Sequence, residues 1–244
     1  MNIFSKKLFQ NNKRESGEDE FLLDDNSGFA IQEAYKALRT NVIFSLPGND
    51  PKCIGVTSAT QGNGKSTNAL NMAISFAQIG KKVIVVDCDL RLPTIAAKLN
   101  VKGEPGLSNI LIGSSTMGEC IQHNDAHNID IIPSGIIPPD ATVLLQSEQM
   151  KKLIANLKIR YDYVFIDMPP VLVTADAAIL SGLVDGFLLV VKHGVSEYRS
   201  VAAMINQLKY ADAHILGVIY ASADEGSRRL KYGHYGYYRK KEQS

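Results

Sequence analysis

The chain has 244 residues, of which 45% are hydrophobic and 21% are charged. This length and composition are typical of one large globular domain with a sizeable core. The 26 basic and 25 acidic side chains give a formal net charge of +1, which disfavours a generally basic nucleic-acid-binding protein.

Cysteine usage and hydropathy indicate the compartment. The three cysteines, Cys53, Cys88 and Cys120, form no C-x-x-C pair, so we expect packed thiols in a reducing compartment rather than disulfides or a metal site. No apolar run approaches the roughly 20 residues that cross a bilayer, and the N-terminus, MNIFSKKLFQNNKRE, is too polar for a signal peptide. We therefore expect a soluble, cytoplasmic protein.

The N-terminal part divides into a polar arm and a helix. Residues 1–26 are rich in Asn, Lys, Glu and Asp, and we expect a flexible arm there. Apolar residues then recur at steps of three and four, which predicts a helix over about residues 31–46 that precedes the first strand. The residues that carry this period are Ile31, Ala34, Leu38 and Val42.

The rest of the domain, which we expect to span residues 27–225, alternates between apolar β-branched runs and helical patterns. The predicted strands are Cys53–Thr57, Val83–Val86, Ile129–Ile132, Val164–Ile166, Phe187–Val191 and Ile215–Ile219. The predicted helices are Thr67–Gln78, Ser147–Leu157, Ala175–Leu183 and Glu197–Tyr210. Strands that are apolar throughout and separated by helices predict an α/β fold, a doubly wound and mainly parallel sheet with helices on both faces.

A glycine-rich segment, ATQGNGKS over residues 59–66, joins the first predicted strand to a helix and fits the phosphate-loop pattern of an NTPase, with Ala in place of the first Gly. Gly62 and Gly64 allow backbone N–H groups to turn toward phosphate oxygens. We expect Lys65 to reach the β- and γ-phosphates and the Ser66 hydroxyl to bind Mg²⁺. The predicted nucleotide-binding residues are Gln61, Gly62, Asn63, Gly64, Lys65, Ser66, Thr67 and Arg91.

Two other predicted strands end in carboxylates. The run VIVV leads into Asp87 and Asp89, and the run YVFI leads into Asp167. The carboxyl ends of parallel strands share one edge of the sheet, where a buried carboxylate needs a cation such as Mg²⁺. The alternative is that these aspartates cap the helices that follow. Arg91, shortly after the first pair, either binds a phosphate, forms an ion pair or is simply exposed.

These segments together resemble one family, the bacterial tyrosine kinases of capsule and exopolysaccharide synthesis, an offshoot of the deviant phosphate-loop ATPases. SATQGNGKST at 58–67 is similar to the family's Walker A motif, VVDCDLRLP at 85–93 to its Walker A′ motif, and FIDMPP at 165–170 to its Walker B motif. The signature lysine of partitioning ATPases would stand five residues before Lys65, where this chain has Thr60. A non-kinase ATPase switch of the partitioning type is nevertheless the alternative function.

The resemblance implies ATP and Mg²⁺ as cofactors and a role for each matching residue. Lys65 contacts the phosphates, and Ser66, Asp87 and Asp167 serve the metal. Either Asp87 or Asp89 helps to deprotonate the tyrosine acceptor. The family usually has Asn near the adenine where this chain has Ala221, so we expect the base to meet backbone groups or the ring of Tyr220.

The predicted N-terminal helix carries the sequence EAYKALR at residues 33–39. Its charged residues Glu33, Lys36 and Arg39 follow three-residue steps along one helical stripe, and they resemble the family's oligomerisation motif. The resemblance implies a homo-oligomeric ring. Lys36 stands in place of the usual Arg and cannot make its planar bidentate contact, so we expect a weaker or salt-sensitive ring. A solvated charged face is the alternative.

Four of the ten tyrosines lie within seven residues near the C-terminus. They are Tyr232, Tyr235, Tyr237 and Tyr238. Glycines interrupt this cluster and basic residues flank it, so we expect residues 226–244 to form a flexible tail that can enter an active site. The resemblance implies that these tyrosines accept phosphate from the adjacent subunit. A nucleic-acid-binding patch and a basic segment for anionic lipid are the alternatives.

The resemblance also implies partners. One is a transmembrane activator of the polysaccharide co-polymerase type, which would recruit this chain to the inner face of the cell membrane. Another is a cognate phosphotyrosine phosphatase. We expect no nucleic-acid partner.

Overall fold

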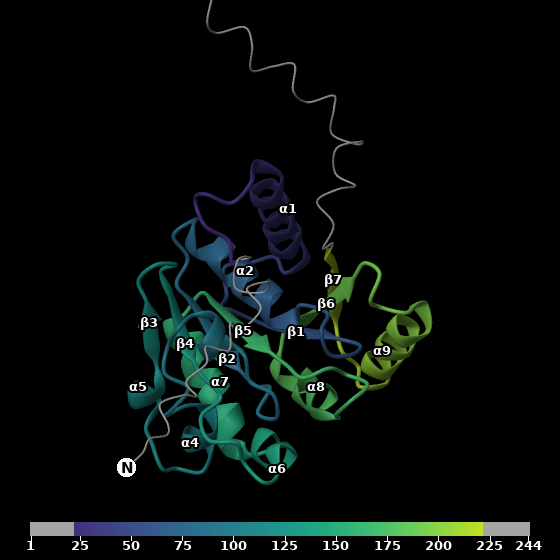
Figure 1. Cartoon of the computed structure of the whole chain (residues 1–244). Helices are drawn as coiled ribbons and strands as arrows, with labels where there is room; N and C mark the ends of the chain where they lie inside the picture. The colour runs from purple at the N-terminus through teal and green to yellow at the C-terminus, as the bar shows by residue number, and fades with distance from the viewer. Residues whose placement is uncertain (1–21, 222–244) are drawn as a thin grey trace, which may run out of the picture.

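The computed structural model describes residues 22–221, and within that range seven strands form one sheet at the centre of the molecule (Figure 1). The strands are β1 (Lys52–Ser58), β2 (Val83–Asp87), β3 (Gln122–Asn124), β4 (Ile129–Ile132), β5 (Tyr163–Asp167), β6 (Gly186–Lys192) and β7 (Ile215–Ala221). Their order across the sheet is β3-β4-β2-β5-β1-β6-β7. All neighbours pair in parallel except β3 and β4, which confirms the mainly parallel sheet.

The predicted strands are all present, and β3 is an addition. It is a polar strand of three residues at the edge of the sheet, so no apolar run marks it in the sequence. As an antiparallel neighbour of β4 it needs no crossover helix. The predicted arm up to residue 21 and the tyrosine-rich tail both lie outside the described residues.

Helices cover both faces of the sheet (Figure 1). They are α1 (Phe29–Ser45), α2 (Lys65–Ala77), α3 (Ile95–Lys98), α4 (Leu107–Leu111), α5 (Met117–Cys120), α6 (Ala141–Leu145), α7 (Glu148–Arg160), α8 (Asp176–Ile179) with the 3-10 turn η2 (Leu180–Leu183), and α9 (Tyr198–Tyr210). The longer helices agree with the predictions to within a few residues. The helices α3 to α6 have four or five residues, too few to show a 3.6-residue period in the sequence.

The core between α2 and the sheet is aromatic. Phe76 of α2 packs on Tyr163 and Phe165 of β5, with ring centroids 4.1 and 5.6 Å apart. Nearly every residue of α2 is buried, because the sheet lies under one side of the helix and α1 covers another. The helix that begins at the phosphate loop is therefore fixed on two sides.

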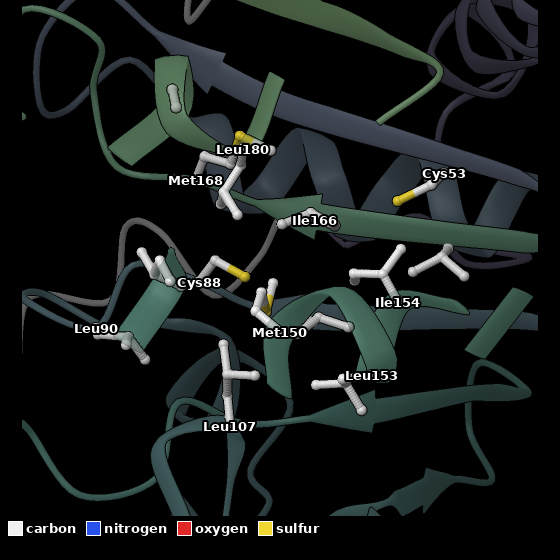
Figure 2. Close-up of a cluster of buried hydrophobic side chains, with 14 of the residues drawn as sticks. Cys53, Cys88, Leu90, Leu107, Met150, Leu153, Ile154, Ile166, Met168 and Leu180 are labelled. Atoms are coloured by element: carbon white, nitrogen blue, oxygen red, sulfur yellow. The ribbon is translucent and has the colours of Figure 1, made fainter. Parts of the chain in front are cut away.

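The core on the opposite face is aliphatic and sulfur-rich (Figure 2). Met150 and Ile154 of α7 pack there with Ile166 of β5 and with Cys88, which follows β2. Cys53 and Cys88 are fully buried and act as small apolar side chains, as we expected. Cys88 and Met168, which directly follow Asp87 and Asp167, belong to this core, so it adjoins the carboxyl ends of β2 and β5.

The helix α1 packs on α2 through a stripe that differs from the predicted one. Val42 is buried, while Ile31, Tyr35 and Leu38 are half-buried against the same core. Ala34 is exposed, and Tyr35 takes the inward position instead. A tyrosine can occupy such a position because its ring is apolar and its hydroxyl finds hydrogen-bond partners.

The folded part begins earlier than the sequence suggested. Leu23, inside the segment expected to be a polar arm, is buried against α2, and its N–H donates to Asn71 Oδ1 at 2.8 Å. Its acidic surroundings hid this anchor in the sequence. Within residues 22–221, no helix is both long and apolar enough to cross a membrane.

Candidate active site

The phosphate loop connects β1 to α2 and has the backbone that its glycines allow. Gly62 and Gly64 have φ angles of +78° and +80°, which few residues other than glycine adopt without strain. Asn63 holds the loop from inside. Its Nδ2 donates to the carbonyl and hydroxyl oxygens of Thr60 at 2.8 and 3.0 Å, and its Oδ1 accepts from Ser196 Oγ at 2.8 Å. The loop is thus shaped by the protein itself.

Lys65, the first residue of α2, lies among carboxylates at the ends of two strands, because Asp167 closes β5 and Asp89 follows β2. Its Nζ is 2.8 Å from Asp89 Oδ2 and 3.4 Å from Asp167 Oδ1, and all three side chains are nearly or fully buried. Burial by itself would lower the pKa of Lys65, but the charges of Asp167 and Asp89 outweigh burial and raise it. The ammonium group therefore stays protonated at neutral pH.

Asp87 and Asp167 are direct neighbours, because they are paired residues at the ends of β2 and β5. Burial, assisted by the charge of Asp167, raises the pKa of Asp87 to about 8. Burial also raises the pKa of Asp167, although Lys65 and Ser66 oppose this. Asp87, Asp167 and the nearby Asp89 are three acidic groups, and the single positive charge of Lys65 can neutralise only one of them. This favours the binding of a further cation.

The residues predicted to serve Mg²⁺ meet at this point. Lys65 Nζ lies 3.2 Å from Ser66 Oγ, and the Ser66 hydroxyl also bonds to Asp167. Among residues 22–221, no group of three His, Cys, Asp or Glu side chains is arranged as a metal cage. Mg²⁺ in nucleotide enzymes is usually held by one or two carboxylates together with phosphate oxygens and water. The donors Ser66, Asp87 and Asp167 fit that mode of binding.

Asp87 also has the structural role that the sequence left open. Its carboxylate accepts from the N–H of Ile95, at the start of α3, and from the N–H of Asp89, both at 3.2 Å. Asp89 Oδ1 accepts from Leu92 N at 3.1 Å. Because β2 ends at Asp87, the two aspartates do not continue one strand, yet both reach the surroundings of Lys65.

Arg91 points to a different partner. Its Nε lies 3.3 Å from Asp176 Oδ2 and its Nη2 lies 3.0 Å from Thr142 Oγ1. Thr142 Oγ1 in turn donates to Asp176 Oδ1 at 2.8 Å. Asp176 is buried, so the guanidinium supplies its countercharge. Of the three possibilities for Arg91, the structure has the ion pair.

The three charged residues of the predicted α1 stripe do not all face the same way. Glu33 and Lys36 form an exposed ion pair of 2.8 Å. Arg39 instead turns toward α2, where its Nη1 donates to the backbone oxygen of Ser75 and to Ser75 Oγ, the latter at 3.1 Å. Within this chain Arg39 therefore anchors α1, and Glu33 and Lys36 are the members of the motif that face outward.

The sequence did not reveal two groups beside the loop. Lys192, the last residue of β6, lies with its Nζ 3.5 Å from the Gly62 oxygen, and Ser196 bonds to Asn63 as described. A signal for Lys192 was present, because a charged residue closes an apolar strand at the same edge of the sheet as the carboxylates. Ser196 has no comparable signal, since its loop position depends on the turn after β6.

Comparisons with known proteins agree with this geometry. Residues 51–215 match the family model of the AAA domain, AAA_31. Tyrosine-protein kinase YwqD of Bacillus subtilis is 38% identical over 206 residues, which cover 84% of this chain and 85% of that protein. Tyrosine-protein kinase CpsD of Streptococcus agalactiae is 34% identical and covers 86% of this chain and 91% of its own length.

A solved structure extends the similarity to three dimensions. The kinase domain of the Escherichia coli tyrosine kinase ETK superposes with a TM-score of 0.78 at 32% identity, covering 81% of this chain and 78% of the other. The family-model match over residues 51–215 spans the phosphate loop and the three aspartates, Asp87, Asp89 and Asp167. By sequence and by fold, the chain belongs to the family of bacterial tyrosine-protein kinases.

Proposed function

We propose that the chain is an ATP- and Mg²⁺-dependent protein-tyrosine kinase that phosphorylates the tyrosines of its own C-terminal cluster, Tyr232, Tyr235, Tyr237 and Tyr238, between subunits. The observation that carries this proposal is the buried cluster in which Lys65 meets Asp89 and Asp167 beside a glycine loop of positive φ. A lysine, a hydroxyl and carboxylates at a preformed loop are what phosphoryl transfer requires.

Different groups of the loop bind different parts of the ATP phosphates. The backbone from Gln61 to Thr67 is suited to surround the β- and γ-phosphates at the N-terminus of α2, where the helix dipole favours an anion. Lys65 would exchange its carboxylate partners for phosphate oxygens. Mg²⁺, when bound through Ser66, Asp87 and Asp167, supplies positive charge to those phosphates.

The transfer itself needs a proton acceptor. The tyrosine oxygen attacks the γ-phosphorus, the bond from that phosphorus to the bridging oxygen of ADP breaks, and the phenol proton passes to Asp87 or Asp89. Lys65 and the backbone N–H groups stabilise the charge that develops on the phosphoryl oxygens. Asp89 is released when Lys65 turns to phosphate, and Asp87 accepts backbone N–H groups and is a proposed ligand of Mg²⁺, so both carboxylates stand beside the reacting groups.

Membership of the family supports a proposal for the assembly and its partners. We propose a homo-oligomeric ring in which Glu33 and Lys36 contact the neighbouring subunit and Arg39 fixes the helix that carries them. We also propose that a transmembrane co-polymerase-type protein activates the kinase and recruits it from the cytoplasm to the inner membrane face, and that a cognate phosphatase removes the phosphates. The process served is capsule or exopolysaccharide synthesis and export.

The competing function is a non-kinase ATPase switch. Partitioning ATPases have a signature lysine at the position of Thr60, whose carbonyl and hydroxyl groups here hold Asn63. The residue at this position thus shapes the loop and offers no cation, which supports the kinase over the switch.

The deciding experiment is incubation of the full chain with radiolabelled ATP and Mg²⁺, with and without the cytoplasmic peptide of a co-polymerase-type activator. We expect label on Tyr232–Tyr238. It should disappear in Lys65→Met and in a variant with all four tail tyrosines changed to Phe, which leaves the described domain intact. ATP hydrolysis without any labelled tyrosine would contradict the kinase and favour the switch.

A further inference from the structure

A chain of hydrogen bonds joins helix α1 to the phosphate loop. Tyr35 Oη on α1 donates to Asn68 Oδ1 on α2 at 2.9 Å, and Asn68 Nδ2 donates to the Gly64 oxygen at 2.8 Å. Gly64 is the last residue of the loop and the N-cap of α2, with φ +80°. Two bonds therefore lead from α1 to the backbone of the loop.

The bond to Gly64 acts on a phosphate-binding group. A peptide unit is planar and trans, so its C=O and N–H point in opposite directions. The Gly64 oxygen and the Lys65 N–H belong to the same unit. The Gly64 oxygen accepts from the backbone N–H of Asn68 at 3.0 Å, as the first bond of α2, and the Asn68 side chain adds a second bond to it. With this second bond Asn68 helps to fix the direction of the Lys65 N–H, which is expected to face phosphate.

The orientation of Asn68 depends in turn on Tyr35. An amide side chain can turn over, which exchanges its oxygen and its NH₂ group. The Tyr35 hydroxyl donates to the Asn68 oxygen, and it accepts from Asn71 Nδ2 at 3.0 Å. Because Asn71 directs the hydroxyl proton toward Asn68, the Asn68 NH₂ group is left facing Gly64.

The network is buried where α1 packs on α2. Asn68 and Asn71 are 5% and 2% exposed, and burial raises the pKa of Tyr35. Asn71 Oδ1 also accepts from the N–H of Leu23, so the segment before α1 joins the same network. The bond from Asn68 to Gly64 lies within α2 and its N-cap, whereas the bonds of the Tyr35 hydroxyl to Asn68 and Asn71 exist only while α1 lies on α2.

We propose that Tyr35 is a positioning residue that couples the docking of α1 to nucleotide affinity, by orienting Asn68 and thereby the peptide unit between Gly64 and Lys65. The proposal rests on the proposed function in one respect, that nucleotide binds at the phosphate loop. The outer side of α1 carries Glu33 and Lys36, so contact between subunits at α1 and nucleotide binding would influence each other through this residue. Such coupling is reciprocal by linkage.

The test compares variants of the full chain by titration with a fluorescent ADP analogue and Mg²⁺, well below the unfolding temperature. Tyr35→Phe keeps the ring and removes the hydroxyl. We expect it to weaken binding about 5- to 10-fold, and Asn68→Ala to do the same. The double variant should bind about as weakly as Asn68→Ala alone, because both substitutions break one line of bonds.

Tyr161→Phe is the matched control. Tyr161 Oη donates to Asp130 Oδ2 at 2.6 Å, so this variant also loses a hydroxyl contact, but the bond joins the end of α7 to β4, away from the loop. We expect comparable loss of thermal stability with ADP affinity within about two-fold of wild type. Hydrogen exchange of residues 61–68 should rise in Tyr35→Phe and not in Tyr161→Phe.

The outcomes separate the coupling from the proposed function. Unchanged ADP affinity in Tyr35→Phe, additive losses in the double variant, or equal weakening in Tyr161→Phe would each overturn the coupling. A wild-type chain that binds no ADP would overturn both. A chain that binds ADP but labels no tyrosine would contradict the kinase, and a weakened Tyr35→Phe would still support the coupling in it.

Discussion

The Nζ of Lys65 lies 2.8 Å from Oδ2 of Asp89, and both side chains are almost completely buried. The ion pair joins the start of α2 to the segment after β2, in front of the phosphate loop. Phosphate oxygens and the Asp89 carboxylate are therefore competitors for one ammonium group. The carboxylate keeps the lysine charged and directed, and phosphate oxygens that bind Lys65 have to exchange with it.

This competition predicts the effect of Asp89→Asn. Removing the negative charge frees Lys65 and lessens repulsion of the phosphates, so ADP should bind about 3- to 10-fold more tightly. Tyrosine phosphorylation should still fall, because a carboxylate of the transfer site is lost. The measurements are a fluorescent ADP titration and a tyrosine-labelling assay on the same preparations.

The control for Asp89→Asn is Asp167→Asn. Asp167 is farther from Lys65, at 3.4 Å, and it is a proposed ligand of Mg²⁺. Its loss should weaken Mg²⁺-dependent binding and leave Mg²⁺-free binding less affected. Weaker ADP binding in Asp89→Asn without Mg²⁺ would show that the ion pair supports the phosphate site and does not compete with it.

Asp87 predicts a pH dependence of stability in the absence of nucleotide. Its pKa in the folded chain is about 8, above the ordinary value of 3.8. Its contribution to the free energy of unfolding is therefore complete below pH 4 and is lost as the pH rises through 8, because the carboxyl ionises more readily in the unfolded chain. Asp87→Asn lacks this charge. We expect the variant to exceed wild type by about 3–6 °C in Tm at pH 8.5, by less at pH 6, and to transfer no phosphate.

Thermal unfolding between pH 5 and 9, without Mg²⁺ and nucleotide, checks this prediction. The difference in Tm between Asp87→Asn and wild type should grow with pH. A difference that is constant, or that shrinks as the pH rises, would mean that the Asp87 carboxylate is not destabilised by burial in the folded chain.

Arg91→Ala tests whether this residue serves the fold or the phosphates. Because Arg91 forms an ion pair with buried Asp176, its loss should lower the free energy of unfolding by about 1–2 kcal/mol. The loss is smaller than for a fully buried pair because the arginine is partly exposed to solvent. Arg91→Lys should recover part of the loss. ADP affinity should stay within about two-fold; a loss above tenfold would place Arg91 on a phosphate.

The exposed pair Glu33–Lys36 predicts how the oligomer responds to salt. If these side chains contact the next subunit, Glu33→Ala should lower the oligomer mass, and Lys36→Arg should make the assembly more resistant to salt, because a guanidinium binds a carboxylate through two bonds. Both residues are half exposed, so the monomer fold should be unaffected. Light scattering at low and high salt measures the mass; unchanged values in both variants would exclude this face of α1 from the interface.

Phosphorylation of the tail predicts a change in assembly. The tail from residue 226 has six Lys and Arg residues and one acidic residue, Glu242. Each phosphate adds about −1.5 to −2 charges, so three phosphates cancel the positive charge of the tail and four reverse its sign. We expect the phosphorylated chain to have a smaller oligomer mass than a variant with Phe at the four tail positions. Equal masses would refute the idea.

The sequence by itself determined the order of the apolar strands and of the longer helices, the phosphate loop, and the three aspartates at or just after the ends of two strands. These are local properties: apolar runs specify strands, and Gly62 and Gly64 permit the φ angles that the loop adopts. The near-neutral total charge concealed a separation, because the basic residues of the tail balance acidic groups elsewhere in the chain.

The tertiary structure decided which side chains share a partner. The register of β2 and β5 places Asp87 beside Asp167. Arg91 pairs with Asp176, and Arg39 binds Ser75 on α2. The tertiary structure also joined Tyr35 to Gly64 through Asn68. Each pairing links residues far apart in the chain through packing of whole elements, and periodicity along the sequence specifies the face of a helix or strand but not the atoms that it meets.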